Sequence, residues 1–408
     1  MWRFVLAVSL LCCSSDASVT CKDENEGQVD WFILYKAPKQ KDKRTGLEYI
    51  YIGPDAHGKV TKRTGTDIKD VLGNTLEPIL KSVRKMPEDF GFISYSDQPP
   101  GCSADNQKFG HSKGVVMVDK TTAVWLLHST PQFPFRRDQN KFWPPSGAKN
   151  AQTFICVKFP SEPANIEHIG KHLQSIRAFP FDHYIPDGFY KELKELKDVV
   201  NWNKLDPPGV LQPLIKKGDV EFYSIAKKQA VKEKGKPGSG QDSDKMEVEE
   251  SDEPMVDCSK DGSPMEIDED PAGGDLYVGD LYVSIAKEVK SHVNVQTWHS
   301  DTEGDISYCK GPENVYNIKS VQIKDLGEWS PGNDHSKWCV DENKLWTCIA
   351  DVNRAKTQFL RYGGALCIKD KNIAEIFMSF KKETESCKDA EERKKKKKQK
   401  VKKKLPPL

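Results

Sequence analysis

The sequence predicts an α/β (α+β) fold built from two similar halves, each a mixed sheet flanked by helices. Strand-like runs alternate with stretches of helical apolar periodicity along most of the chain. In addition, the tripeptide His-Ser-Lys occurs twice, beginning at His111 and at His335, although the chain has only nine histidines. A motif that recurs with similar flanks indicates an internal duplication. We therefore expect the functional site where the two halves meet.

Residues 1–17 have the features of a secretory signal peptide. Arg3 supplies the positive charge, Phe4–Leu11 is a short apolar run, and Ser15-Asp16-Ala17 provides small residues for cleavage. The alternative is a short buried helix at the N-terminus. No later apolar run is long enough to cross a bilayer, so we expect no membrane insertion.

The N-terminal half, residues 18–231, is predicted to be a compact α/β unit. Its strand-like runs and helical stretches are, in order, Trp31–Tyr35, Ile68–Val83 (helical), Phe92–Tyr95, Val115–Val118, Val124–Leu127, Phe154–Phe159 and Ile166–Ile176 (helical).

An acidic loop at residues 232–274 is expected to be disordered, because its composition cannot bury enough apolar surface to offset the entropy of ordering. Order resumes in the C-terminal half, residues 275–387, with a helix-like run at Leu281–Val289 and a strand-like run at Val293–Trp298.

The chain ends in a basic tail, residues 388–408, whose lysines should repel one another and keep it extended and disordered. The tail is interpreted as a DNA tether, with the acidic loop competing with DNA for a basic cleft, or as a nuclear signal. Equally, both charged segments are inert and only aid solubility.

Removal of Cys12 and Cys13 with the signal peptide leaves nine of the 11 cysteines. In an oxidising compartment most should be paired, and an odd number leaves at least one thiol free or bonded to another chain. The sequence has no Cys-x-x-Cys, His-Glu-x-x-His, Walker loop or Gly-x-Ser-x-Gly motif. It therefore gives little support to a metal site, a nucleotide hydrolase or a serine hydrolase.

Each His-Ser-Lys motif opens a predicted hairpin. A strand follows the motif, a polar turn comes next, and a second strand begins near Trp125 in the first copy and Trp346 in the second. The first hairpin returns to His128-Ser129 and the second to Asp351-Val352-Asn353. Polar groups can thus come back beside each motif.

Residues i and i+2 of a strand share a face, so each histidine should lie on the same face as its lysine, His111 with Lys113 and His335 with Lys337. If the copies pair about an approximate dyad, two imidazoles and two ammonium groups converge. Such a site fits a phosphodiester. The lysines neutralise the phosphate, one neutral histidine attacks phosphorus, and the other, protonated, donates to the leaving oxygen. Acid pH should favour this chemistry.

Other polar residues have two interpretations. His128 either orients phosphate or is simply hydrogen-bonded to the backbone. Asp351 and Asn353 either orient His335 or cap a turn. The remaining histidines lack such a context and are assigned no function.

These residues resemble the acid deoxyribonuclease (deoxyribonuclease II) family of the phospholipase D-like superfamily. The similar stretches are Val29-Asp30-Trp31-Phe32, Tyr35-Lys36-Ala37-Pro38, Asp97-Gln98-Pro99-Pro100, Gly110-His111-Ser112-Lys113-Gly114, His128-Ser129, Phe133-Pro134 and Asp334-His335-Ser336-Lys337-Trp338-Cys339-Val340. The resemblance implies a pseudo-dimer with its active site at the pseudo-two-fold interface. It also implies a metal-independent endonuclease with no cofactor, which cuts double-stranded DNA at acid pH, leaves 3'-phosphate ends and clamps the duplex in a U-shaped arrangement.

Residue by residue, the resemblance implies that His111 and His335 are catalytic, with His111 favoured as nucleophile and His335 as acid. It assigns phosphate binding to Lys113, Lys337, His128 and Asn353. It further suggests the disulfides Cys21–Cys156, Cys309–Cys367 and Cys339–Cys348, and leaves Cys102, Cys258 and Cys387 unassigned.

Two features depart from relatives. Val118 stands where the wider superfamily places an aspartate after its lysine, which makes a phospholipid substrate less expected, and Asp119 lies one residue further. No Asn-x-Ser/Thr acceptor occurs, whereas lysosomal relatives are commonly glycosylated. We therefore expect a protein of the secretory pathway that is either lysosomal or, like the venom-type members of the family, secreted, and that is a monomer or a homodimer.

Two other function classes remain open. A fold with a basic cleft could bind duplex DNA without cutting it, although both motifs are complete. A lipid or other phosphodiester hydrolase on the same scaffold is the third candidate.

Overall fold

The computed structural model describes residues 19–189, 193–229, 256–257, 279–298 and 304–404, with side chains as far as residue 396. The predicted signal peptide and all of the acidic loop except residues 256–257 lie outside these ranges.

The first part of the chain forms an eight-stranded sheet. In chain order its strands are β3 (Trp31–Lys36), β4 (Tyr49–Pro54), β5 (Val60–Gly65), β6 (Gly91–Ser96), β8 (Lys113–Val118), β9 (Thr122–His128), β10 (Gln152–Pro160) and β11 (Pro180–Tyr184). Side by side they run β11-β6-β8-β9-β10-β3-β4-β5, and every pair is antiparallel. The expectation of a mixed sheet is wrong here, because hairpins such as β3–β4–β5 and β8–β9 make neighbouring strands antiparallel.

The second sheet has nine strands. They are β12 (Gln212–Lys217), β13 (Val220–Ala226), β15 (Val293–Gln296), β16 (Val315–Ile323), β17 (Gly327–Trp329), β18 (Trp338–Asp341), β19 (Trp346–Ala350), β20 (Gly364–Lys369) and β21 (Lys381–Thr384). This sheet is mixed, because β15 and β16 are parallel. Since β12 already belongs to it, the chain enters the second sheet before residue 212, earlier than the expected boundary at 231.

Five neighbouring strands have the same order in both sheets. They are β3-β10-β9-β8-β6 in the first sheet and β13-β20-β19-β18-β15 in the second. Within each set all neighbours are antiparallel. The strands that follow the two His-Ser-Lys motifs, β8 and β18, occupy the same place in this order.

The described residues also form α-helices. They are α1 (Ile68–Leu76), α2 (Pro163–Ser175), α3 (Lys194–Val200), α4 (Leu281–Val289), α5 (Lys356–Phe359), α6 (Lys371–Phe380) and α7 (Cys387–Lys404). Helix α4 has the predicted bounds. The helix predicted at Ile68–Val83 ends at Leu76, because Pro78 cannot donate to an α-helical ladder and instead starts a 3₁₀ turn at Glu77–Ile79. Among the described residues, no helix has both the length and the apolar character needed to span a membrane.

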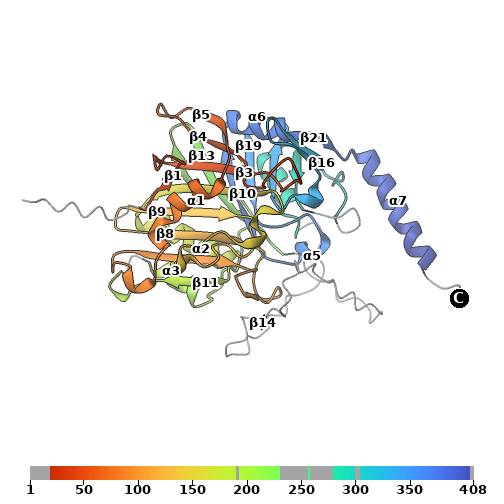
Figure 1. The fold of residues 1–408 in the computed structure, drawn as a ribbon. Coiled ribbons are helices and arrows are strands. Elements are labelled where there is room, and N and C mark those ends of the chain that lie inside the picture. The colour runs from red at the N-terminus through yellow and green to blue at the C-terminus, as the bar shows by residue number, and fades with distance from the viewer. Residues whose placement is uncertain (1–18, 190–192, 230–255, 258–278, 299–303, 405–408) are drawn as a thin grey trace, which may run out of the picture.

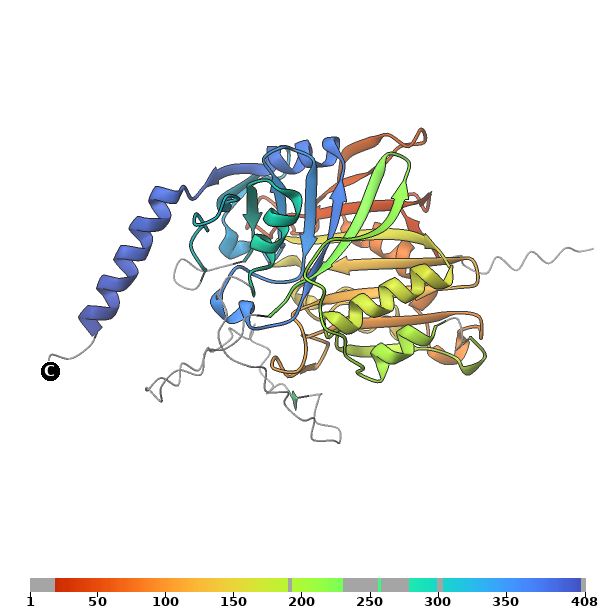
Figure 2. The same ribbon diagram turned by 180° about the vertical axis from the view of Figure 1, so that it is seen from behind.

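The two sheets pack face to face. Their shared core includes residues of both sheets and of helices α2 and α6, and Trp31 of β3 meets Phe222 of β13 with ring centroids 5.9 Å apart. Helix α1 covers the outer face of the first sheet and α4 that of the second. Figure 1 shows α1 in front of the first sheet, and Figure 2 shows the blue and green strands of the second sheet crossing the yellow and orange strands of the first.

The disulfides confirm one of the three predicted pairs, Cys21–Cys156. Cys309 bonds to Cys387 rather than to Cys367, and Cys348 bonds to Cys367 rather than to Cys339, so the other two predictions are wrong. For Cys348 the sheet register allows either partner.

Cys348 on β19 lies opposite Cys339 of β18 on one side and opposite Cys367 of β20 on the other. It can bond to only one of them. Cys339 is left as a buried free thiol, and Cys102 is disulfide-bonded as well.

The basic tail is not extended as far as Lys404, because residues 387–404 form helix α7, which projects from the body (Figure 1). The Cys309–Cys387 disulfide anchors its start. Arg393 then donates to Glu385 at 3.2 Å and to the carbonyl oxygen of Gly304 at 3.0 Å. Lysine is also a good helix former.

Two short pairs complete the fold. Strand β1 (Cys21–Lys22) pairs with β2 (Gln28–Val29), and β7 (Cys102–Ser103) pairs in parallel with β14 (Val256–Asp257). The last strand lies within the segment for which the sequence predicted no structure.

Candidate active site

The first His-Ser-Lys motif leads into β8. The buried carboxylate of Asp97 binds the side chains of its histidine and its lysine. Nδ1 of His111 lies 2.7 Å from Oδ2 of Asp97, and Nζ of Lys113 donates to Oδ1 of Asp97 at 2.6 Å. Arg361, from the second half of the chain, donates from Nη2 to Oδ2 of Asp97 at 3.0 Å. All four residues therefore form one charged cluster in the interior.

These contacts set the protonation of the cluster. Burial opposes ionisation of Asp97, but the hydrogen bond from His111 and the positive charges of Lys113 and Arg361 overcome it and hold the pKa of Asp97 well below its usual range. Burial lowers the pKa of His111 to about 3, although Asp97 acts in the opposite direction. His111 is therefore neutral. Because a carboxylate only accepts hydrogen bonds, Nδ1 carries the proton and Nε2 keeps its lone pair.

The second motif precedes β18 and has different surroundings. The ring of His335 packs edge-on against Trp298 with centroids 5.5 Å apart, and Nζ of Lys337 donates to the carbonyl oxygen of His335 at 2.7 Å. In the part of the chain that the structure describes, no side chain hydrogen-bonds to the His335 ring. The two histidines thus share a motif but not a partner.

Asp334 holds the second motif in place through hydrogen bonds. Its Oδ2 accepts from Tyr35 at 2.5 Å and from Trp329 at 2.7 Å, and its Oδ1 accepts from the backbone N–H of Ser336 at 2.9 Å. Burial raises the pKa of Asp334. Since Tyr35 belongs to β3, this network ties the second motif to the first sheet.

A charged group of the first motif changes the pKa values of the second. Burial lowers the pKa of His335 well below its usual range, and the charges of Lys337 and Lys113 lower it further. Burial and the charge of Lys113 likewise lower the pKa of Lys337 to about 7. The charge of Lys113 in the first motif therefore acts on His335 and Lys337 of the second.

The backbone of each motif donates a hydrogen bond to a loop of the other half. The N–H of His111 donates to the carbonyl oxygen of Tyr362 at 3.0 Å, and the N–H of His335 donates to the carbonyl oxygen of Ala151 at 2.9 Å. Tyr362 lies between β19 and β20, whereas Ala151 lies between β9 and β10. Each half thus supplies the acceptor for the histidine of the other.

His128 ends β9 beside Lys113, because its neighbour Leu127 pairs with Gly114. Its ring packs against Phe133 and Phe154, with centroids 4.8 Å and 5.7 Å away, and its Nδ1 accepts from the N–H of Thr130 at 3.2 Å. Burial holds its pKa well below its usual range. His128 is therefore a neutral ring whose Nε2 carries the proton and is buried without a partner.

Asn353 and Asp351 follow β19 on the side of the second motif. Oδ1 of Asn353 and Oδ1 of Asp351 are buried without a hydrogen-bond partner, while Oδ2 of Asp351 accepts from the N–H of Gly364 at 2.9 Å. Burial raises the pKa of Asp351 to about 8. Unpaired buried oxygens next to a cationic site can accept from a ligand or from water.

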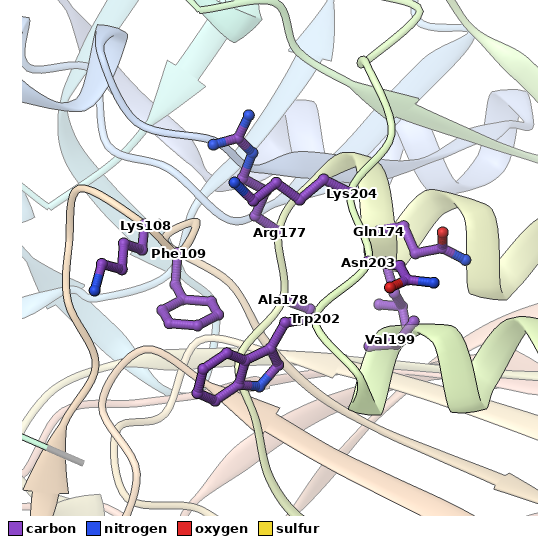
Figure 3. A pocket seen from close by; sticks show the side chains of 10 residues that line it. Lys108, Phe109, Gln174, Arg177, Ala178, Val199, Trp202, Asn203 and Lys204 are labelled. Atoms are coloured by element: carbon purple, nitrogen blue, oxygen red, sulfur yellow. The ribbon is translucent and has the colours of Figure 1, made fainter. Parts of the chain in front are cut away.

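A small cavity of about 10 Å³ lies next to the first motif (Figure 3). Lys108, Arg177 and Lys204 are among its lining residues, and Phe109 packs edge-on against Trp202 with centroids 5.4 Å apart. Of these residues, Lys108 and Phe109 directly precede the Gly110-His111 segment, and the N–H of Gly110 donates to the carbonyl oxygen of Arg177 at 2.9 Å.

Sequence reasoning missed Asp97, Arg361, Tyr362 and Ala151 as parts of the site. Asp97 carried a signal, since it stands in one of the stretches on which the family resemblance rested. The other three carried none, because backbone acceptors and a lone arginine have no recognisable spacing. Within the described ranges, no group of three or more His, Cys, Asp or Glu side chains is arranged to hold a metal ion.

The chain is similar to known nucleases over nearly its whole length. The model of the family described as Deoxyribonuclease II matches residues 20–235 and 270–387. The chain is 27% identical to human Deoxyribonuclease-2-beta, over 91% of this chain and 92% of that protein. It is 29% identical to Plancitoxin-1 of Acanthaster planci, over 91% and 93%, and 28% identical to Deoxyribonuclease-2-alpha of Sus scrofa, over 91% of each. A family match of this extent establishes that the chain belongs to the deoxyribonuclease II family of nucleases.

Proposed function

We propose that this chain is an endonuclease that hydrolyses phosphodiester bonds of double-stranded DNA at acid pH, without a metal ion, and leaves 3'-phosphate ends. Its family supports the DNA substrate. One observation carries the mechanism: the N–H of His111 donates to Tyr362 of the second half and the N–H of His335 donates to Ala151 of the first, so both motifs lie where the halves meet and can serve one phosphate.

The architecture belongs to this proposal. The two sheets are the halves of a phospholipase D-like pseudo-dimer, with the active site at the pseudo-two-fold interface. The shared order of five strands supports this relation, and so does the reciprocal exchange of backbone acceptors.

His111 is the nucleophile. Asp97 accepts the proton of Nδ1 and orients the ring, so the lone pair of Nε2 attacks phosphorus and forms a P–N bond. The bond from phosphorus to the 5'-oxygen breaks in the same step. A pKa of about 3 keeps His111 neutral, as attack requires.

His335 is the general acid. It gives its proton to the leaving 5'-oxygen, and then, as a neutral base, takes a proton from the water that breaks the P–N bond. Water supplies the oxygen of the 3'-phosphate, and His111 is restored. In the free protein Lys337 and Lys113 lower the pKa of His335. A bound phosphodiester adds negative charge beside these cations, which raises that pKa again.

Lys113, Lys337 and Arg361 supply the positive charge that stabilises the pentacoordinate transition state, so this chain's own side chains perform that task. The proton on Nε2 of His128 and the unpaired oxygen of Asn353 are additional contacts for the phosphate and its water. Such groups act through hydrogen bonds rather than through charge.

The partner is double-stranded DNA. Both motifs belong to one chain, so a monomer has a complete site and a homodimer would have two. We place the protein in the secretory pathway, secreted or lysosomal, because the predicted signal peptide and the buried disulfides are typical of an oxidising compartment.

The test is cleavage of supercoiled plasmid in EDTA at about pH 5 and at about pH 7.5. The wild-type protein should nick the plasmid at the acid pH, and His111→Ala and His335→Ala should not. His57→Ala, which changes an exposed histidine outside the site, is the control and should remain active. Product ends should be extended by a polymerase only after phosphatase treatment.

Three results would count against the proposal. Nicking that disappears in EDTA would contradict metal independence, and equal activity of His111→Ala would remove the two-histidine mechanism. Binding of plasmid without any nicking would favour a DNA-binding protein instead.

A further inference from the structure

Two buried lysines outside the motifs occupy equivalent positions in the two sheets. Lys36 is the last residue of β3, the strand that pairs with β10. Lys227 directly follows β13, the strand that pairs with β20. Both side chains are fully buried. The internal repeat therefore includes an ammonium group at the same end of the same strand in each half.

Lys36 binds the loop that leads to Ala151. Its Nζ donates to the carbonyl oxygens of Asn150 at 2.6 Å and Ala148 at 3.3 Å, and also to those of Ala37 and Gly46, each at 2.9 Å. Ala151 is the next residue after Asn150, and its carbonyl oxygen accepts from the N–H of His335.

Lys227 binds the equivalent loop in the other half. Its Nζ donates to the carbonyl oxygen of Phe359 at 3.0 Å, and its backbone N–H donates to Gly363 at 3.0 Å. Between these two anchor points lie Arg361, which donates to Asp97, and Tyr362, which accepts from His111. The segment that holds the first motif is thus fixed at both ends by Lys227.

We propose that Lys36 and Lys227 are positioning residues for catalysis: Lys36 fixes the loop that orients His335, and Lys227 fixes the loop that orients His111. This inference rests on the proposed function, since it assigns the two histidines their roles. Neither lysine touches the substrate. Each acts through a loop of its own half on the histidine of the other half.

The charge state of both lysines agrees with an enzyme that works in acid. Burial lowers the pKa of Lys36 to about 7, against Asp334 and Glu48, which raise it, and together with Arg44, which lowers it. Burial likewise lowers the pKa of Lys227 to about 7, with Asp280 raising it and Arg361 lowering it.

Both groups are therefore ammonium ions below about pH 7 and lose a proton above it. An ammonium has three donors for the loop carbonyls, one more than a neutral amine. Its hydrogen bonds are also charge-assisted and so stronger.

The experiment measures kcat and KM for Lys36→Met and Lys227→Met with two substrates. One is plasmid DNA, and the other is thymidine 3'-(p-nitrophenyl phosphate), whose leaving group departs without a proton. Methionine keeps most of the volume and removes the donors. Because small misplacements of reacting groups are costly, we expect kcat on DNA to fall about 10- to 100-fold with KM changed by less than about twofold.

The nitrophenyl substrate separates the two roles. In the first turnover, measured as the initial burst of nitrophenolate, Lys36→Met should lose much less activity on it than on DNA, because this leaving group needs no general acid and His335 acts only as the base of the later hydrolysis step. Lys227→Met should lose about as much on both, because the nucleophile His111 is needed for each. Lys158→Met is the matched control: Lys158 lies on β10 and pairs with Asp30 at 3.1 Å, away from both loops. It should match wild type on both substrates.

An unchanged kcat per folded molecule in both variants, or equal losses on both substrates in Lys36→Met, would overturn the inference. If Lys36→Met does not yield folded protein, Gly46→Ala carries the same test. A Cβ at Gly46 would lie 2.2 Å from the carbonyl oxygen of Ala148 and would displace the same loop. A wild-type protein that cleaves neither substrate would refute the proposed function itself, which distinguishes the two failures.

Discussion

Nδ1 of His111 and Oδ2 of Asp97 lie 2.7 Å apart inside the protein, with Lys113 and Arg361 on the same carboxylate. His335, which has the same motif, rests against Trp298 instead. A duplicated motif has thus acquired two environments. One fixes a tautomer with a free lone pair, and the other leaves the ring with no hydrogen-bonding side chain among the described residues.

Asp97→Asn should abolish most activity while the protein stays folded. The amide can donate to Nδ1 and favours the tautomer in which Nε2 carries the proton, so the lone pair is lost from the attacking nitrogen. We expect kcat to fall about 1,000-fold or more, as in triads that lose their aspartate. Asp182→Asn, in a pair with Arg137 elsewhere, is the control and should retain activity. A loss of less than about tenfold in steady-state cleavage would contradict the assigned role.

The pH profile should have limits on both sides. The pKa of His111 is lowered to about 3, so the nucleophile is neutral above that pH and activity falls as the pH drops through it. The pKa of Lys337 is lowered to about 7, so its charge is present below that pH and lost above it, and KM for DNA should rise there. Steady-state kinetics from about pH 2.5 to about pH 8.5 measures both limits.

Lys337→Met is the control for the alkaline limit. Its KM should be raised at acid pH already and should rise less than that of wild type above pH 7. A wild-type KM that does not change between about pH 6 and about pH 8 would exclude this explanation of the acid preference.

Gly110→Ala should disable the site through the backbone. A Cβ at Gly110 would lie 2.0 Å from the carbonyl oxygen of Ile176 and 2.9 Å from that of Tyr362, which accepts from His111. We expect a loss of about 1–3 kcal/mol in unfolding free energy and a fall of about 100-fold in kcat. Gly188→Ala has no atom within 4 Å of its new Cβ and should change neither. Urea denaturation and plasmid cleavage, measured on the same samples, decide the outcome.

Peptide mapping without reduction should recover the pairs Cys309–Cys387 and Cys348–Cys367. Cys339 is buried and burial raises the pKa of its thiol, so it should react with a thiol reagent only after denaturation. Recovery of a Cys339–Cys348 peptide would contradict the structure. Replacing Cys309 and Cys387 together by serine should cost about 2–4 kcal/mol of stability.

Local patterns in the sequence predicted the strands around the motifs and helix α4, because alternating and helical apolar spacing decide which face is buried. They could not predict that β12 and β13, which precede the acidic loop, belong to the second sheet. The pairing of β13 with β20 joins residues more than a hundred positions apart, and such pairing leaves no local trace. The overlong helix prediction at Ile68–Val83 failed at Pro78, where a local rule was available.

The sequence predicted the candidate site only where the same residue types recur at the same spacing. The duplication led to His111, Lys113, His335 and Lys337, since residue types at fixed spacing are visible in a sequence. Arg361 was not predictable, because it reaches Asp97 from a position 264 residues away. The disulfides show the same limit, since three cysteines on adjacent strands allow two pairings and the register places Cys348 opposite both of the others.

The crossed hydrogen bonds of His111 to Tyr362 and of His335 to Ala151 have a consequence for how the molecule can be divided. Neither half expressed as a separate polypeptide would contain a finished catalytic centre, even with its own motif intact. Mixing the two fragments should restore cleavage only as far as they assemble. If the loop at Ala151 or at Tyr362 is altered in one fragment, the assembled pair should not cleave DNA, because the histidine of the other fragment loses its backbone acceptor.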